Sequence, residues 1–221
     1  MTFLTVLLLH VALGQAPSTG SGQALAATPQ KAQPPDAIAP AILQKLAADG
    51  VRVDVKPSTT LEFWWVAGLP LRPGSGAPSW TDVEEGALVG AVRIPVDFRD
   101  IRGRVIKAGV YTLRYGIQPQ NGDHLGVSPF REFLLLSPAA VDQDPAPRGH
   151  DGTIEISKQS IGGSHPGVWS IDPPVASGAP LSLHKTELGH DAVIMEVPVA
   201  RDGKPSGSLK FGLVLVGKIE A

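Results

Sequence analysis

Three histidines of this chain stand directly beside an aspartate: His124, His150 and His190. An imidazole can ligate zinc while a carboxylate orients its ring, and bound zinc activates water for hydrolysis. We therefore consider a divalent metal site in which His124, His165 and His190 converge from separate loops. Each Asp–His pair also lies beside glycine, and aspartate is favoured at turns for its local hydrogen bonds. Because no two histidines are spaced two or four residues apart, we favour the turn interpretation and expect no cofactor.

Hydrolysis by a serine nucleophile is the other chemistry to consider. The segment SIGGSHPG places Ser160 and Ser164 close to His165. It contains no Gly-x-Ser-x-Gly elbow, and adjacent Ser and His side chains diverge on an extended backbone. We therefore predict no catalytic residue and favour a protein that is not an enzyme.

Tryptophans offer a route to ligand binding instead. Trp64 alternates with Trp65 and so faces away from the predicted core. Trp80 and Trp169 lie in loop-like surroundings. Aromatic rings near carboxylates would suit a glycan or a small apolar ligand, so Trp64, Trp80 and Trp169 are the candidate ligand-binding residues. The alternative, which we favour for Trp64, is burial beneath a predicted helix over residues 37–49.

Charge and cysteine content exclude several classes of function. The formal net charge is −2 and no basic run occurs, so phosphate contacts with nucleic acid are not expected. The chain has no cysteine, which excludes disulfides, thiolate chemistry and cysteine-linked lipids.

The N-terminus predicts export. Residues 3–14 form a twelve-residue apolar run, which is too short to span a bilayer but typical of a signal-peptide core. We expect cleavage after Ala16, giving a signal peptide over 1–16 and a flexible linker over 17–35. The leading Met-Thr lacks a basic residue, and the alternative is a buried N-terminal element. Because no second run of that kind follows, we expect no membrane span in the mature chain, which would be periplasmic or secreted.

The remaining residues, 36–221, are expected to form one domain of strands. After a short amphipathic helix over 37–49, the apolar pattern changes from helical to alternating. Further helical turns are predicted over 137–144 and 152–161. Seven strands are clear and two more are plausible, in this order: 51–56, 61–66, 92–98, 110–117, 130–136, 193–199 and 209–215, with 87–91 and 181–185 in addition. Turns rich in Gly, Pro and Asp separate them, so we predict an all-β, antiparallel Greek-key sandwich.

The segment IKAGVYTL resembles the tyrosine corner of immunoglobulin-like and fibronectin-like Greek-key domains. The resemblance implies that the Tyr111 hydroxyl bonds to nearby backbone where the chain passes between strands. More loosely, the mature chain resembles uncharacterised exported bacterial proteins with a similar AGVYTLRYG segment and a later His-Pro loop. Neither likeness implies an activity.

These observations predict an exported β-sandwich that binds or recognises a partner in the cell envelope. A glycan, a small apolar ligand or another envelope protein would be that partner. The alternatives are a structural envelope protein without a ligand site and, less favoured, a metal-dependent hydrolase that uses the loop histidines.

Overall fold

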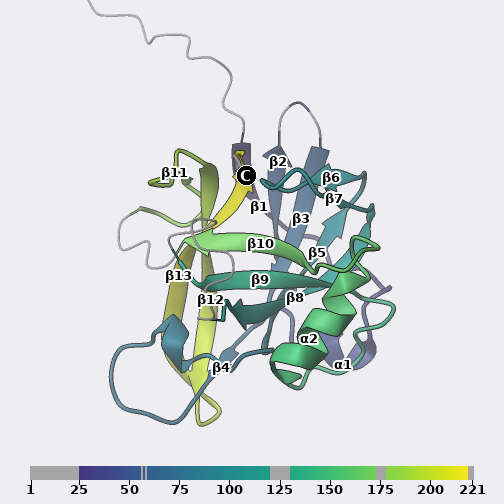
Figure 1. The fold of residues 1–221 in the computed structure, drawn as a ribbon. Helices are drawn as coiled ribbons and strands as arrows, with labels where there is room; N and C mark the ends of the chain where they lie inside the picture. Colours follow the sequence, from purple (N-terminus) through teal and green to yellow (C-terminus); the bar gives the residue numbers. More distant parts are fainter. Residues whose placement is uncertain (1–24, 56, 58, 120–129, 173–177, 219–221) are drawn as a thin grey trace, which may run out of the picture.

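Strands dominate the computed structural model, which describes residues 25–55, 57, 59–119, 130–172 and 178–218. The prediction of an all-β chain is confirmed (Figure 1). The predicted signal peptide and His124 lie outside the described residues. The strands are β1 (Leu25–Gln30), β2 (Gly50–Val55), β3 (Thr59–Trp65), β4 (Leu69–Leu71), β5 (Leu88–Ile94), β6 (Phe98–Arg99), β7 (Val105–Ile106), β8 (Gly109–Ile117), β9 (Glu132–Pro138), β10 (Gly167–Asp172), β11 (Leu183–Lys185), β12 (Asp191–Arg201) and β13 (Lys204–Val216). The helices are α1 (Pro40–Leu43) and α2 (Gly149–Lys158), with a 3-10 turn over Trp80–Asp82.

All of the strands except β6 and β7, which pair only with each other, form one long curled sheet rather than the two packed sheets of a Greek-key sandwich (Figure 1). Its order is β1-β2-β3-β5-β8-β9-β10-β13-β12-β11, and β4 adds a parallel pairing to β12. The β1 end of the sheet returns to lie beside β12, so the whole is a half-barrel. Strand twist accumulates across so many strands and makes a long sheet curl. The alternating pattern predicts which face of each strand is buried, but it does not predict whether two buried faces belong to one sheet.

Strand β10 is where the sheet turns its corner. Its first residues, Gly167–Ser170, pair with β9, while Ile171 and Asp172 pair with β13. All six residues of β10 are buried, so the segment shows no alternation of apolar and polar residues. For that reason the sequence pattern did not predict this strand.

Aromatic rings fill the space enclosed by the curled sheet. Trp65 stacks on Phe63 at a centroid distance of 5.5 Å and meets Phe211 edge-on at 5.4 Å. Trp80 meets the same Phe211 edge-on at 5.2 Å, and Trp169 lies 5.6 Å from Phe63. Such stacked and edge-on pairs stabilise the folded protein by more than the burial of their surface area alone. The core therefore takes up Trp80 and Trp169, whose sequence surroundings resemble loops.

The N-terminal region differs from its prediction in two ways. Residues 25–30, placed in a flexible linker by their small polar composition, form β1 and pair along their whole length with β2. Leu25 is buried in the core, which gives this strand an apolar anchor. The helix predicted over 37–49 shortens to α1, which begins at Pro40, and the chain then makes an isolated bridge between Leu46 and Val66. The core contacts of this region, rather than helix propensity, decide its structure.

Of the two other predicted helices, the structure contains one and lacks the other. The one over 152–161 is confirmed in place by α2, whereas residues 137–144 finish β9 and enter a turn. Asp142 in that turn forms a fully buried ion pair with Arg114 of β8, with 2.6 Å between Arg114 Nε and Asp142 Oδ2. Arg114 also donates to the carbonyls of Gly86 and Ala146. A charge so buried needs such partners, and they hold the turn against the sheet.

Tyr111 makes the contact that the tyrosine-corner resemblance implies. Its side chain is 4% exposed, and its hydroxyl donates to the carbonyl of Lys107 at 2.8 Å. Here the contact lies at the start of β8 within a continuous sheet. Tyr111 is thus a residue of the fold.

Candidate functional site

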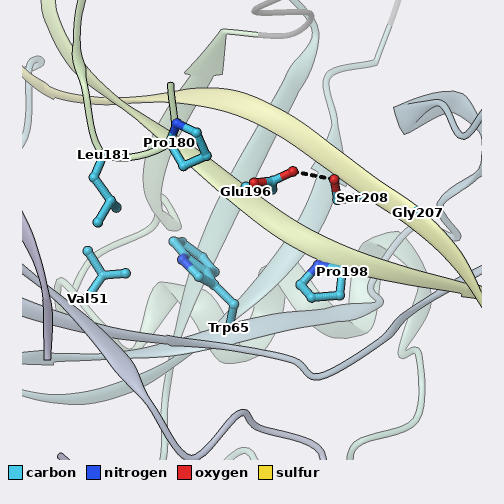
Figure 2. A pocket seen from close by; sticks show the side chains of 8 residues that line it. All are labelled: Val51, Trp65, Pro180, Leu181, Glu196, Pro198, Gly207 and Ser208. Atoms are coloured by element: carbon cyan, nitrogen blue, oxygen red, sulfur yellow. Dashed lines mark hydrogen bonds between the residues drawn. The ribbon is translucent and has the colours of Figure 1, made fainter. Parts of the chain in front are cut away.

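A cavity of about 490 Å³ opens where the β2–β3 side of the sheet faces the β12–β13 hairpin (Figure 2). Most of its lining is apolar, and Glu196 and Ser208 supply the polar side chains. The lining residues are Val51, Trp65, Pro180, Leu181, Glu196, Pro198, Gly207 and Ser208. They come from both sides of the curled sheet and from the loop before β11, so the cavity depends on the complete fold.

Trp65, the last residue of β3, forms the inner wall. Its ring is held between Phe63 and Phe211, and only 6% of the residue is exposed. Gly90 of β5 lies behind it, where a Cβ atom would come within 2.8 Å of the Trp65 ring. Within the described part of the chain, the buried Trp65 Nε1 has no hydrogen-bond partner. Packing alone therefore positions this indole.

Leu181 forms the opposite edge of the cavity in a strained conformation. Its φ is 66°, a left-handed value that branched side chains rarely adopt. Backbone hydrogen bonds keep Leu181 in this conformation. Leu181 N donates to the carbonyl of Ile194 at 2.7 Å, and Ile194 N donates to the carbonyl of Ser182 at 2.9 Å. Figure 2 shows the Leu181 side chain facing Val51 across the cavity. Strain of this kind is retained where the surrounding contacts fix it, and it is found at binding sites more than elsewhere.

Glu196 and Ser208 form the polar part of the wall. They lie on neighbouring strands of the β12–β13 hairpin, and the Ser208 hydroxyl donates to the Glu196 carboxylate (Figure 2). A register shift between Pro198 and Ala200 bends β12 just beyond Glu196. Pro198 is the residue opposite Ser208, and its ring extends the apolar wall beside the carboxylate.

The polar side chains of the lining are the Ser208 hydroxyl and the Glu196 carboxylate. No histidine or lysine is among the described residues that line the cavity. The Ser208 hydroxyl donates to a carboxylate. A largely apolar cavity of this size with a few convergent polar groups is typical of a small-molecule site.

The three tryptophans predicted to bind a ligand are buried elsewhere. Trp64, Trp80 and Trp169 are 2%, 5% and 1% exposed, and in the described structure none of them lines the cavity. Trp64 Nε1 donates to the carbonyl of Ala32 at 2.6 Å, so the segment before α1 covers it. That is the alternative interpretation of Trp64, with a backbone segment rather than a long helix as the cover. None of the three indoles forms an exposed aromatic platform here.

The histidines do not gather into a metal centre among the described residues, where no group of three or more His, Cys, Asp or Glu side chains is found. His165 is exposed just before β10, and His190 is buried with Nε2 3.4 Å from the carbonyl of Lys218. Two other histidines pair with distant acids: His150 with Glu85 at 2.6 Å, and His184 with Asp172 at 2.9 Å.

The sequence alone does not point to Trp65, Leu181, Glu196 or Ser208 as site residues. Trp65 and Glu196 follow the alternating pattern of ordinary strands, and Ser208 belongs to a polar strand end. Pro198 in a strand was a usable signal, because proline inside a strand marks an edge or a bulge. What brings these residues together is the curl of the sheet.

Comparison with protein-family models, curated proteins and solved structures gives no match for this chain. No helix in the described ranges is long and apolar enough to cross a membrane. The case for a function therefore rests on the geometry of the cavity.

Proposed function

We propose that this protein is a binding module that takes a small, mainly apolar ligand into the cavity between β2–β3 and β12–β13. The observation that carries the proposal is the lining itself. Trp65, Val51, Leu181 and the two prolines surround a single polar pair on one wall. Each 100 Å² of apolar ligand surface removed from water there contributes roughly 2.5 kcal/mol, enough to hold a weakly polar ligand.

The strain at Leu181 supports the same proposal. A leucine with a φ of 66° costs roughly 1 kcal/mol compared with an ordinary conformation. That cost is expected if the Leu181 side chain contacts a ligand at the edge of the cavity, and it is not expected if the loop only connects strands.

We further propose that the protein acts after export, in the periplasm or outside the cell. The support is the apolar run over residues 3–14 with small residues after it. A ligand-binding module with a leader of this kind would meet its ligand in the cell envelope.

A purely structural envelope protein is the second candidate. It is favoured by the burial of all four tryptophans, which are between 1% and 6% exposed. In that case the cavity would be a solvent-filled gap between the two sides of the sheet.

Calorimetric titration with 1-octanol separates the two candidates. Ser208→Phe places a ring in the cavity at an exposed position and should abolish octanol binding while the protein remains folded. Glu187→Phe adds the same ring at another exposed position, outside the cavity lining, and should bind octanol like the unaltered protein. Absence of octanol binding to the unaltered protein, or equal binding by both variants, would contradict the proposed function.

A further inference from the structure

We infer that the cavity selects ligands that carry a positively charged amine on an apolar body, and that Glu196 receives the ammonium group. This inference rests on the proposed function and specifies the class of ligand. It depends on the position of one carboxylate and on the groups that surround it.

Glu196 stands half-buried in a wall that is otherwise mostly apolar. A carboxylate only accepts hydrogen bonds and has about four lone-pair sites. In the described structure, the Ser208 hydroxyl is the donor that reaches it, and no ion pair includes Glu196. Most of its accepting capacity is therefore available to a ligand. A neighbouring apolar wall reduces the share of water around the charge, which strengthens a bond to an ammonium group.

Lys210 is the basic residue nearest to Glu196 in the strand register. The two lie directly opposite each other on β12 and β13, yet the Lys210 ammonium approaches the carbonyl of Gly178, at 3.5 Å. It is not among the residues that line the described cavity. Lys210 therefore weakens the negative potential at the cavity without occupying the carboxylate.

The apolar body of the ligand would lie against the opposite wall. Figure 2 shows Trp65 and Val51 on one side of the cavity, with Glu196 and Ser208 together on the hairpin across from them. A ligand with a charged group at one end and an apolar chain at the other matches this division. A ligand with a carboxylate in place of the amine would bring two like charges together.

Three probes of equal chain length test the inference by calorimetric titration near neutral pH: octylammonium, 1-octanol and octanoate, each as monomers in solution. Octylammonium should bind about tenfold more tightly than octanol, and octanoate more weakly than octanol. Glu196→Gln keeps an acceptor for Ser208 but removes the charge. It should remove the preference, so that octylammonium binds to this variant no more tightly than octanol does.

Lys210→Met should change octylammonium binding in the direction opposite to Glu196→Gln, because it removes a positive charge near Glu196. Octylammonium should then bind severalfold more tightly. Glu187→Gln removes one exposed negative charge outside the cavity and should leave the order of the three probes unchanged. Octanol binding with no preference for octylammonium, or a preference that survives Glu196→Gln, would overturn this inference alone. Failure of all three probes to bind would overturn the proposed function with it.

Discussion

Trp64 and Trp65 are neighbours in the sequence with opposite roles in the structure. Trp64 lies on the outer face of β3 and its Nε1 donates to Ala32, whereas Trp65 lies on the inner face and its Nε1 has no partner within the described residues. Both indoles are almost fully buried, at 2% and 6% exposure. The two indoles therefore differ in one hydrogen bond and in that Trp65 lines the cavity.

Replacing each indole by phenylalanine isolates that difference. Both changes remove a similar area of buried ring, but only Trp64→Phe leaves the carbonyl of Ala32 without its donor. We expect Trp64→Phe to lower the free energy of unfolding by about 1 kcal/mol more than Trp65→Phe, measured by urea denaturation. Octanol binding should be weakened by Trp65→Phe and not by Trp64→Phe. Equal stability losses together with equal binding would contradict these assignments.

Tyr111 makes the stability of the fold depend on pH in the alkaline range. Burial raises the pKa of its hydroxyl above the usual value, and the charge of Asp97 raises it further. Because the unfolded group ionises near pH 10, its contribution to stability is complete below that pH. The contribution is lost as pH rises from there through the higher pKa of the folded state. The pKa of Tyr115 is also raised, mainly by burial, so part of this loss has a second source.

Tyr111→Phe should have two measurable effects. At neutral pH it should lower the free energy of unfolding by about 1 kcal/mol, because the bond to Lys107 is lost. Above pH 10 it should reduce the alkaline loss of stability without abolishing it, since Tyr115 remains. Urea titrations at pH 7, 9 and 11 give both quantities. A variant that matches the unaltered protein at every pH would refute the structural role of Tyr111.

At the scale of elements, β1 shows why composition misled the prediction. Its residues, LAATPQ, carry little apolar surface, and a stretch of that kind is usually a linker. Pairing with β2 satisfies its backbone, and Leu25 contributes the anchoring contact.

Leu25→Ala tests whether β1 belongs to the folded unit. Leu25 is 1% exposed, so truncation should cost about 2–3 kcal/mol of the free energy of unfolding. Ala26→Ser on the exposed side of the same strand should cost little. Thermal denaturation of both variants checks this. If Leu25→Ala were as stable as Ala26→Ser, residues 25–30 would behave as the linker that their composition indicates.

Prediction from the sequence succeeded where apolar residues alternate along a strand, as in β2, β3, β8, β12 and β13, and in the continuous apolar run of β9. It failed where buried residues include glycine and polar side chains without a regular pattern, as in β10, and where pairing rather than apolar content makes the strand, as in β1. The candidate site could not be predicted from the sequence for a related reason. Trp65 and Glu196 are 131 positions apart, and only the curl of the whole sheet brings their walls together.

In the complete fold the two sides of the half-barrel form one cavity against Trp65, and we propose that a ligand binds there. An NMR titration of the four tryptophan indole N–H signals with octylammonium tests it most directly. We predict that the Trp65 signal shifts progressively to saturation while those of Trp64, Trp80 and Trp169 stay in place, because Trp65 is the indole that lines the described cavity. Shifts confined to the other three indoles, or no shift of any of the four at saturating probe, would show that octylammonium does not bind against Trp65.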